Sequence, residues 1–167
     1  SLFEDNAEHG LGMFLGQKKI RDDLKAKVET IADKVPEAAK WLETYNDADA
    51  NQAASKELVA ALEKLDCGCD TRAEILAKKD YLNKKSCWIF GGDGWAFDIG
   101  FGGVDHVLAS GEDVNIFVFN TEVYSNTGGQ ASKASNIGQV AQFAAAGKEI
   151  KSKSLAEIAM TYGYVYV

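Results

Sequence analysis

A glycine-rich stretch that carries a carboxylate is the part of this sequence best suited to chemistry. It reads FGGDGWAFDIG, residues 90–100, and it follows the short apolar run CWIF, residues 87–90. Glycines adopt positive φ values easily and let the backbone approach a phosphate closely, but the carboxylate of Asp93 would repel a phosphate. A bridging Mg²⁺ would remove this conflict, because Mg²⁺ prefers oxygen ligands and commonly joins protein oxygens to substrate phosphates.

A second polar segment follows the next apolar run of the chain. The run VNIFVFN, residues 114–120, precedes Thr121, which lies 28 residues after Asp93 (121 − 93). A span of this length fits one strand, a connecting helix and a parallel neighbouring strand. The carboxyl ends of such strands lie side by side, where ligands of open α/β sheets bind. The sequence therefore predicts that the Asp93 carboxylate, the Thr121 hydroxyl and nearby carbonyl oxygens converge.

These residues alone leave other interpretations open. Asp-Gly is a common turn dipeptide, so GGDG, residues 91–94, could be a simple turn. A nucleotide-binding loop of another kind fits less well. Phe97 stands where a dinucleotide-binding loop has its third glycine, and the Gly-Lys-Ser/Thr of a P-loop is missing. Thr121 and Asn126 could also serve only to cap the end of a strand.

Strands that alternate with helices must position these residues. The expected strands are residues 87–90, 114–120 and 164–167. The expected helices are residues 96–109, 137–146 and 154–162. This alternation favours an α/β fold, in which a parallel sheet is flanked by helices. Within the loop of residues 125–136, Thr127–Gln130 is either a polar turn near the site or only a flexible connection.

The first half of the chain predicts a helical N-terminal segment without candidate catalytic residues. Residues 1–15 predict a loop or short helix. Helices with apolar residues at helical spacing are then expected from residue 17 onward and at residues 36–45, 50–65 and 70–83. We therefore divide the chain into a mainly helical segment, residues 1–85, that packs on an α/β core, residues 86–167. Because the sequence stops within the strand-like YGYVYV, we expect one truncated domain of a larger enzyme.

The charge and the cysteine content narrow the class of protein. A net charge of −7 argues against a nucleic-acid or anionic-membrane surface, which needs clustered Lys and Arg. No apolar run reaches the ~18 residues of a membrane span. The cysteines, Cys67, Cys69 and Cys87, lack the four-ligand spacing of an iron–sulfur cluster. A Cys-x-Cys pair rarely bridges to itself, so three thiols are expected, and they favour a reducing compartment, the cytoplasm or an anaerobic organelle.

Longer motifs add a resemblance to a known family. GDGWAFDIGFGGVDHVLASGEDVNIFVFNTEVYSNTGGQASKA, residues 92–134, resembles the thiamine-diphosphate-binding segment of pyruvate:ferredoxin (flavodoxin) oxidoreductases. GDG with a downstream Asn is the general thiamine diphosphate signature, whereas DHVLASGEDVN, NTEVYSNTGGQ, AAAGK and YGYVYV are similar to this family in particular. The opening SLFEDNAEHG resembles it as well. The resemblance implies the thiamine-diphosphate-binding fold.

The resemblance also implies roles for individual residues. Mg²⁺ would be held by the carboxylate of Asp93, the hydroxyl of Thr121 and the carbonyl of Val123, and it would bind the diphosphate. Asn126 would be the catalytic residue, facing the reacting end of the cofactor, where an amide can hydrogen-bond developing charge. The cofactor-binding residues implied in this way are Gly92, Asp93, Gly94, Trp95, Thr121, Val123 and Asn126.

The implied reaction is the oxidative decarboxylation of pyruvate to acetyl-CoA and CO₂. Its cofactors would be thiamine diphosphate, Mg²⁺ and 4Fe–4S clusters, whose ligands are expected outside this chain. Pyruvate and coenzyme A would be the substrates, ferredoxin or flavodoxin the redox partner, and the parent a homodimer with further domains. The chain alone would then be inactive. The alternatives are a non-catalytic scaffold, an oxidoreductase of another 2-oxo acid and an unrelated nucleotide-binding domain.

Overall fold

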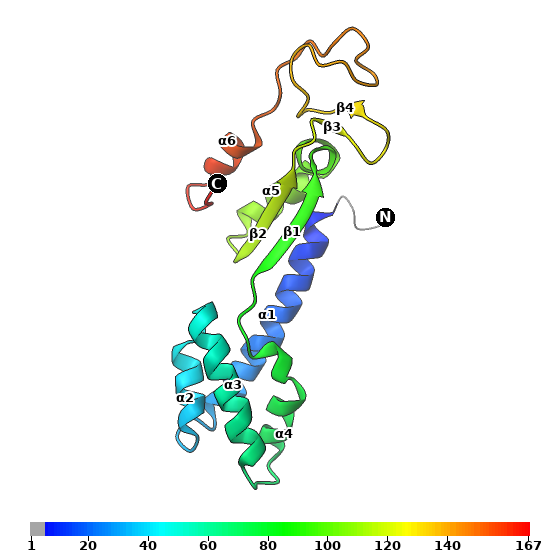
Figure 1. Ribbon diagram of the computed structural model, residues 1–167. Helices are drawn as coiled ribbons and strands as arrows, with labels where there is room; N and C mark the ends of the chain where they lie inside the picture. The colour runs from blue at the N-terminus through cyan, green and yellow to red at the C-terminus, as the bar shows by residue number, and fades with distance from the viewer. Residues whose placement is uncertain (1–5) are drawn as a thin grey trace. The chain divides into compact units, whose positions relative to one another are not determined.

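The computed structural model describes residues 6–167, which divide into two compact units. One unit comprises the described residues up to Met13 together with Cys87–Val167, and the other comprises Phe14–Ser86. Residues 1–5, which begin the expected helical segment, lie outside the described residues. Helix α1 (Ala7–Glu29) crosses the boundary in sequence, so its first residues belong with the strands (Figure 1). The division into a helical segment, residues 1–85, and an α/β core, residues 86–167, within one truncated domain stays a prediction.

The unit Phe14–Ser86 is helical, as the sequence predicts. Its elements after α1 are α2 (Pro36–Glu43), α3 (Ala48–Lys64), α4 (Asp70–Ala77) and the 3₁₀ helix η1 (Lys79–Tyr81). Pro36 begins α2, where its missing N–H leaves no helical hydrogen bond unmade. The Asp47 carboxylate caps α3 by accepting the Ala50 N–H at 2.9 Å.

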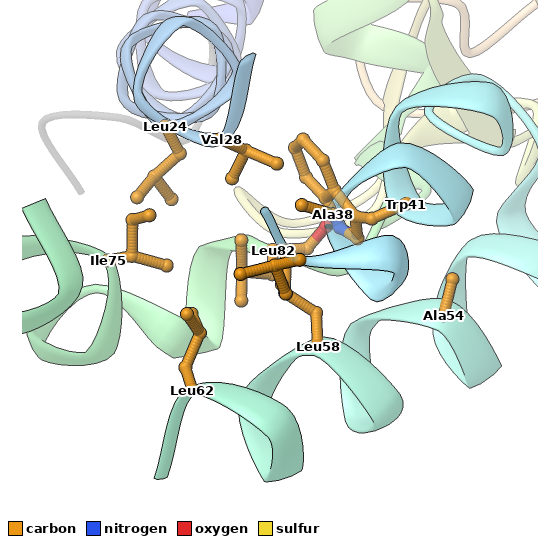
Figure 2. Close-up of a cluster of buried hydrophobic side chains, with 10 residues drawn as sticks. Leu24, Val28, Ala38, Trp41, Ala54, Leu58, Leu62, Ile75 and Leu82 are labelled. Carbon is orange, nitrogen blue, oxygen red and sulfur yellow. Dashed lines mark hydrogen bonds between the residues drawn. The ribbon is translucent and has the colours of Figure 1, made fainter. Parts of the chain in front are cut away.

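One apolar cluster holds this helical unit together (Figure 2). Trp41 is fully buried, and its indole N–H lies 3.1 Å from the Ser55 hydroxyl and 3.2 Å from the Leu82 carbonyl, so its polar atom is satisfied. The largest other members are Leu24, Val28, Leu58, Leu62, Ile75 and Leu82. Side chains of this size each contribute about 1.5–3 kcal/mol when buried.

The first residues of α1 decide between the loop and the short helix expected for residues 1–15. Residues 7–15 begin a helix of 23 residues, although they include Gly10 and Gly12, which disfavour helices. At Gly10 a Cβ atom would lie 2.8 Å from the side chain of Ile89 on strand β1. The glycine therefore lets the helix approach the strand closely, and this packing outweighs the poor helix propensity.

The α/β unit is built on two parallel strands. Strand β1 (Cys87–Gly92) pairs with β2 (Val114–Phe119), in a register that runs from Cys87 opposite Val114 to Gly92 opposite Phe119. The connection between them contains the π-helix η2 (Gly94–Ile99) and helix α5 (Phe101–Ala109), which lies behind β2 in Figure 1. The predicted strand–helix–strand step and the α/β class are thus confirmed.

Two expectations for the last third of the chain are wrong. Residues 137–146 form turns rather than a helix, because Gly138 and Phe143 have φ values of +78° and +65°, which a right-handed helix does not admit. Residues 164–167 are not a strand of the sheet. Helix α6 (Leu155–Met160) ends before Gly163, whose φ of +73° is typical of a residue just beyond a helix.

A short hairpin precedes these turns. Strand β3 (Val123–Tyr124) pairs antiparallel with β4 (Gln130–Ala131). The turn that joins them contains Gly128 and Gly129, with φ values of +125° and +84°, and the Gly129 N–H donates to the Tyr124 carbonyl at 2.8 Å. The segment Thr127–Gln130 is therefore an ordered polar turn and not a flexible connection.

One face of the parallel sheet carries exposed aromatic rings. Trp88 and Phe90 on β1 and Phe117 and Phe119 on β2 are 44–59% exposed. Their ring centroids lie 5.0–6.2 Å apart in successive pairs. Parallel sheets are normally covered on both faces. We call these four rings the aromatic face.

The cysteines differ from expectation. The structure pairs Cys67 with Cys69 in a disulfide and leaves Cys87 as a free thiol, so the expectation of three thiols is wrong for the first two.

Within residues 6–167, no helix is long and apolar enough to cross a membrane.

Candidate functional site

The site begins where the two parallel strands end. Gly92 closes β1 opposite Phe119, the last residue of β2, so the residues that follow each strand are neighbours. The Thr121 hydroxyl donates to Asp93 Oδ1 at 2.8 Å, and the Thr121 backbone N–H reaches the same oxygen at 3.3 Å. The predicted convergence of Asp93 and Thr121 is therefore present in the structure.

A third oxygen joins these two. The Thr121 hydroxyl oxygen lies 3.0 Å from the carbonyl oxygen of Val123, the first residue of β3. Neighbouring ligands of an octahedral Mg²⁺ lie about 3 Å apart, because each metal–oxygen distance is about 2.1 Å. The distances from Thr121 Oγ1 to Asp93 Oδ1, 2.8 Å, and to Val123 O, 3.0 Å, thus fit neighbouring ligands of one magnesium ion.

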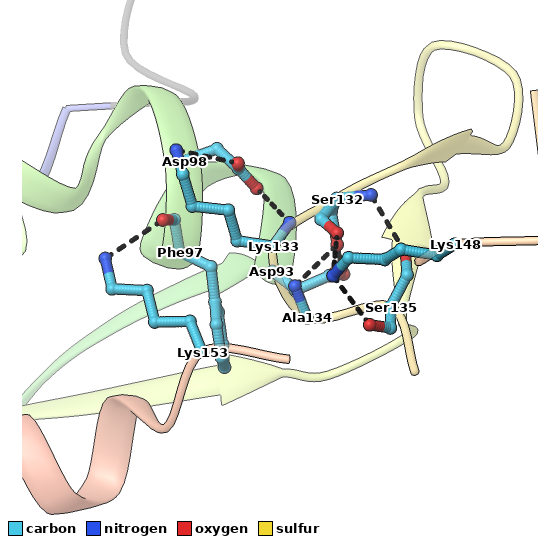
Figure 3. Close-up of polar contacts among 9 residues, drawn as sticks. All are labelled: Asp93, Phe97, Asp98, Ser132, Lys133, Ala134, Ser135, Lys148 and Lys153. Carbon is cyan, nitrogen blue, oxygen red and sulfur yellow. Dashed lines mark hydrogen bonds and ion pairs between the residues drawn. The ribbon is translucent and has the colours of Figure 1, made fainter. Parts of the chain in front are cut away.

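The buried charge of Asp93 is the second reason to expect a cation. Asp93 is 0% exposed, and its carboxylate accepts hydrogen bonds from the hydroxyls of Thr121 and Ser132 (Figure 3). Within residues 6–167, no Lys or Arg side chain forms an ion pair with it. A buried carboxylate is costly without a cationic partner. A divalent cation at this edge would supply the missing positive charge.

The glycines around Asp93 let other groups come close to the backbone, and they do not adopt unusual φ values. None of Gly91, Gly92 and Gly94 has a positive φ, so that expectation is wrong. A Cβ at Gly94 would lie 2.5 Å from the Tyr124 ring, whereas a Cβ at Gly92 would meet no protein atom within 4 Å. Gly94 is therefore needed for packing, and the open space at Gly92 is available to a ligand.

Trp95 forms the base of this loop. Its side chain is 4% exposed, and its ring occupies the positions that Cβ atoms would take at Gly91 and Gly100. Its indole N–H has no hydrogen-bond partner among the described residues. The ring thus fixes the conformation of the glycine loop from inside, and its direct contact with a cofactor stays a prediction.

Asn126 lies in the β3–β4 hairpin turn, three residues after Val123. The residue is exposed, and the turn is ordered by a hydrogen bond of 2.7 Å from the Thr127 hydroxyl to the Gln130 side-chain carbonyl. The hairpin therefore joins the proposed metal ligand Val123 directly to the turn that carries Asn126. The catalytic role of Asn126 stays a prediction.

Comparison with known proteins assigns the chain to a family. Residues 67–167 match the family described as "Thiamine pyrophosphate enzyme, C-terminal TPP binding domain". The chain belongs to the thiamine pyrophosphate enzyme family. Thiamine pyrophosphate is another name for thiamine diphosphate, so the sequence resemblance to a thiamine-diphosphate-binding segment is confirmed.

Individual relatives of this thiamine pyrophosphate enzyme domain are much longer. The chain is 49% identical to the pyruvate-flavodoxin oxidoreductase of Klebsiella pneumoniae over 100% of its length and 15% of the relative's. It is 49% identical to the pyruvate:ferredoxin oxidoreductase of Moorella thermoacetica, again over 100% of the chain and 15% of the relative's length. The mitochondrial pyruvate dehydrogenase [NADP(+)] of Euglena gracilis is 45% identical over 100% of the chain and 10% of its own length. The chain therefore spans about one seventh of the first two relatives.

Ser132 is a residue of this candidate site that no sequence pattern predicted. Ser132 is 4% exposed, and its hydroxyl donates to Asp93 Oδ2 at 2.7 Å across 39 residues of sequence. The only local signal is the Ser-x-x-Ser spacing of Ser132 and Ser135, whose hydroxyl accepts the Ser132 N–H at 2.9 Å. That spacing indicates a turn but not its contact with Asp93.

Three lysine side chains connect the segment around Ser132–Ser135 to neighbouring backbone and to Asp98. Lys148 donates to the carbonyls of Ser132 and Ser135 at 2.9 and 2.7 Å, and Lys133 forms an ion pair with Asp98 at 3.2 Å. Lys153 donates to the Phe97 carbonyl at 3.0 Å, and burial, together with the charge of Lys133, lowers the pKa of Lys153. These cations hold the loop that contacts Asp93 against the helical turn η2.

Proposed function

We propose that this chain is the thiamine diphosphate- and Mg²⁺-binding part of a pyruvate:ferredoxin or pyruvate:flavodoxin oxidoreductase. The observation that carries the proposal is the group of oxygens from Asp93, Thr121 and Val123, in which the Asp93 carboxylate is buried and has no Lys or Arg partner among residues 6–167. The 49% identity to oxidoreductases of this kind over the whole chain supports the choice of substrate.

Each residue has a defined task in this proposal. Asp93, Thr121 and Val123 would hold the metal ion through oxygen atoms, and the ion would neutralise charge on the diphosphate. The bare backbone at Gly92 leaves room for that diphosphate. Thiamine diphosphate, when bound, supplies the carbanion chemistry that decarboxylates a 2-oxo acid. Asn126 donates a hydrogen bond toward the reacting end, where negative charge develops.

The remaining parts of the reaction belong to other parts of the parent enzyme. They comprise the 4Fe–4S clusters, the docking of ferredoxin or flavodoxin and the binding of coenzyme A. The chain spans 15% of the relatives' length, which leaves ample sequence for these parts. We further propose a cytoplasmic homodimer as the parent. Another part of the same polypeptide would cover the aromatic face, because that face lacks the layer that a parallel sheet requires.

The electron acceptor is set outside this chain. The relative from Euglena gracilis is named for NADP⁺, whereas those from Klebsiella pneumoniae and Moorella thermoacetica are named for flavodoxin and ferredoxin. All three match the whole chain at 45–49% identity. Similar thiamine pyrophosphate domains thus accompany different acceptors. We therefore assign this chain to the pyruvate half-reaction.

Calorimetric titration of the chain with thiamine diphosphate, with and without Mg²⁺, tests the proposal. Binding that requires Mg²⁺ and disappears in Asp93→Ala is expected. Asp113→Ala is the matched control, because Asp113 precedes β2 at the end of the strand opposite Thr121. Binding that persists without metal or in Asp93→Ala overturns the proposed metal site. The absence of any binding favours the alternative of a non-catalytic scaffold.

A second assay tests the proposed division of labour. Pyruvate- and coenzyme-A-dependent reduction of a dye should be undetectable with the chain alone, since the clusters are assigned to other parts of the parent. A sustained rate from the chain alone would contradict that assignment.

A further inference from the structure

We propose that Ser132 is a positioning residue of the metal site, which holds the Asp93 carboxylate so that Oδ1 faces Thr121 and Val123. The Ser132 hydroxyl donates to Asp93 Oδ2 at 2.7 Å, and both side chains are at most 4% exposed (Figure 3). The inference rests on the proposed function, because it assigns Ser132 a task toward the same metal ion.

The two oxygens of Asp93 have separate partners. Oδ1 accepts from Thr121 on the side of the proposed ligands, and Oδ2 accepts from Ser132. The terminal torsion of an aspartate is broad and roughly two-fold, so the side chain itself does not fix the plane of its carboxylate. A donor on each oxygen fixes that plane. Without Ser132, Oδ2 would be a buried acceptor without a donor, and the carboxylate would be free to turn.

Ser132 is itself held in a fixed orientation. Its hydroxyl oxygen accepts the Ala134 N–H at 3.1 Å, which leaves its own hydrogen to point at Asp93. The Ser135 hydroxyl accepts the Ser132 N–H and donates to the Glu122 carbonyl. Lys148 closes the turn by donating to the carbonyls of Ser132 and Ser135. The loop 132–135 is thus a rigid support for a ligand that lies 39 residues earlier.

This role predicts a specific loss in Ser132→Ala. Partners that orient a metal ligand typically contribute about 10–100-fold to metal affinity. We therefore expect the Mg²⁺ concentration for half-saturation to rise by at least about 10-fold, measured in the presence of thiamine diphosphate. The affinity for thiamine diphosphate at saturating Mg²⁺ should stay unchanged, because the hydrogen of the Ser132 hydroxyl is donated only to the Asp93 carboxylate. Ser132→Thr, which keeps the hydroxyl, should recover most of the Mg²⁺ affinity.

The experiment measures metal binding by the whole chain, with Mg²⁺ and in parallel with Mn²⁺. The concentration of free Mn²⁺ is measured by its electron paramagnetic resonance signal. Ser110→Ala is the matched control, because it removes a serine hydroxyl that bonds to the Val107 carbonyl and the Glu112 N–H and to neither Asp93 nor residues 132–135. Circular dichroism establishes that each variant is folded. If Ser132→Ala does not fold, Ser132→Thr and Ser132→Cys, which keep a side chain of similar size, carry the comparison.

The outcomes separate the two proposals. A selective loss of metal affinity in Ser132→Ala, with recovery in Ser132→Thr, supports the positioning role. Unchanged metal affinity in Ser132→Ala, or an equal loss in Ser110→Ala, overturns that role and leaves the proposed function intact. If the unmodified chain binds no thiamine diphosphate with Mg²⁺, the proposed function fails, and the role of Ser132 fails with it.

Discussion

The Thr121 hydroxyl lies 2.8 Å from Asp93 Oδ1, although 28 residues separate the two in sequence. The parallel pairing of β1 and β2 creates this contact by placing the ends of both strands at one edge. The same hydroxyl oxygen is 3.0 Å from the Val123 carbonyl. One strand–helix–strand step and the first residue of a hairpin therefore place two oxygens at about the spacing of magnesium ligands from the Thr121 hydroxyl.

Thr121→Val tests the hydroxyl as a ligand. Valine has nearly the same shape but offers neither a ligand oxygen nor a donor to Asp93, so the chain should fold and lose metal affinity. We expect the loss to reach the upper end of the range for metal-site substitutions, about 100-fold. Magnesium titration in the presence of thiamine diphosphate measures it. Thr121→Ser, which retains the hydroxyl, should bind nearly as the original chain, and an equal loss in both variants would count against this role.

Alanine substitutions at Gly92 and Gly94 should affect different properties, cofactor binding at Gly92 and stability at Gly94. At Gly94 a Cβ would lie 2.5 Å from the Tyr124 ring, so Gly94→Ala should lower the free energy of unfolding by about 1–3 kcal/mol. At Gly92 a Cβ meets no protein atom within 4 Å, so Gly92→Ala should change that free energy by less than about 0.5 kcal/mol. The Gly92 variant should instead weaken the binding of thiamine diphosphate.

Urea unfolding and calorimetric titration of the two glycine variants separate these effects. A Gly92→Ala chain with normal stability and unchanged cofactor affinity would show that the open space at Gly92 is not used by the diphosphate.

Tyrosine ionisation should weaken the helical unit at high pH. Burial, followed by a hydrogen bond of 2.7 Å to Asp22, raises the pKa of Tyr45 from 10.0 to about 12. The protonated form is therefore favoured in the folded state. This contribution to stability is complete below the unfolded pKa of 10.0 and is lost as the pH rises through about 12.

The variant Tyr45→Phe tests this sign, because phenylalanine cannot ionise. Urea unfolding at several pH values between 10.0 and about 12 should show a smaller loss of stability in the variant. A separate loss should remain in the α/β unit, since the hydrogen bond to Asp105 raises the pKa of Tyr162 to about 12 as well. The same pH dependence in both chains would contradict the ionisation of Tyr45 as a cause.

The aromatic face should bind apolar probes in the isolated chain. We expect enhanced fluorescence of 8-anilinonaphthalene-1-sulfonate with the folded chain and a clear reduction in the double variant Phe90→Ser/Phe117→Ser. Both rings are exposed, at 59% and 44%, so the double variant should keep most of its stability. Phe97→Ser is the contrasting variant, because Phe97 is 7% exposed and its loss should destabilise the fold. Equal probe binding by the original chain and the double variant would show that the rings are not an open surface.

The parts of this fold that could be predicted depend on local pattern. The continuous apolar runs 87–90 and 114–120 read as buried parallel strands, and the 28 residues from Asp93 to Thr121 fit a single crossover. The convergence of Asp93, Thr121 and Val123 follows from that topology together with the resemblance to a known family.

The parts that could not be predicted depend on tertiary surroundings. Residues 137–146 have apolar residues, yet Val140 and Phe143 are 70% and 92% exposed, so no apolar surface in the described residues supports a helix there. Conversely, α1 extends through Gly10 because Ile89 packs against it. The contact of Ser132 with Asp93 spans 39 residues and follows from no local pattern.

The central claim is that a divalent cation lies between Asp93 and the diphosphate of the cofactor. Crystals of the chain grown with thiamine diphosphate and Mn²⁺, which replaces Mg²⁺ and scatters anomalously, test it most directly. We expect an anomalous peak about 2.1–2.2 Å from Asp93 Oδ1, Thr121 Oγ1 and Val123 O, with diphosphate oxygens completing the shell. A cofactor bound with its metal ion elsewhere and the Asp93 carboxylate turned away from it would contradict the account.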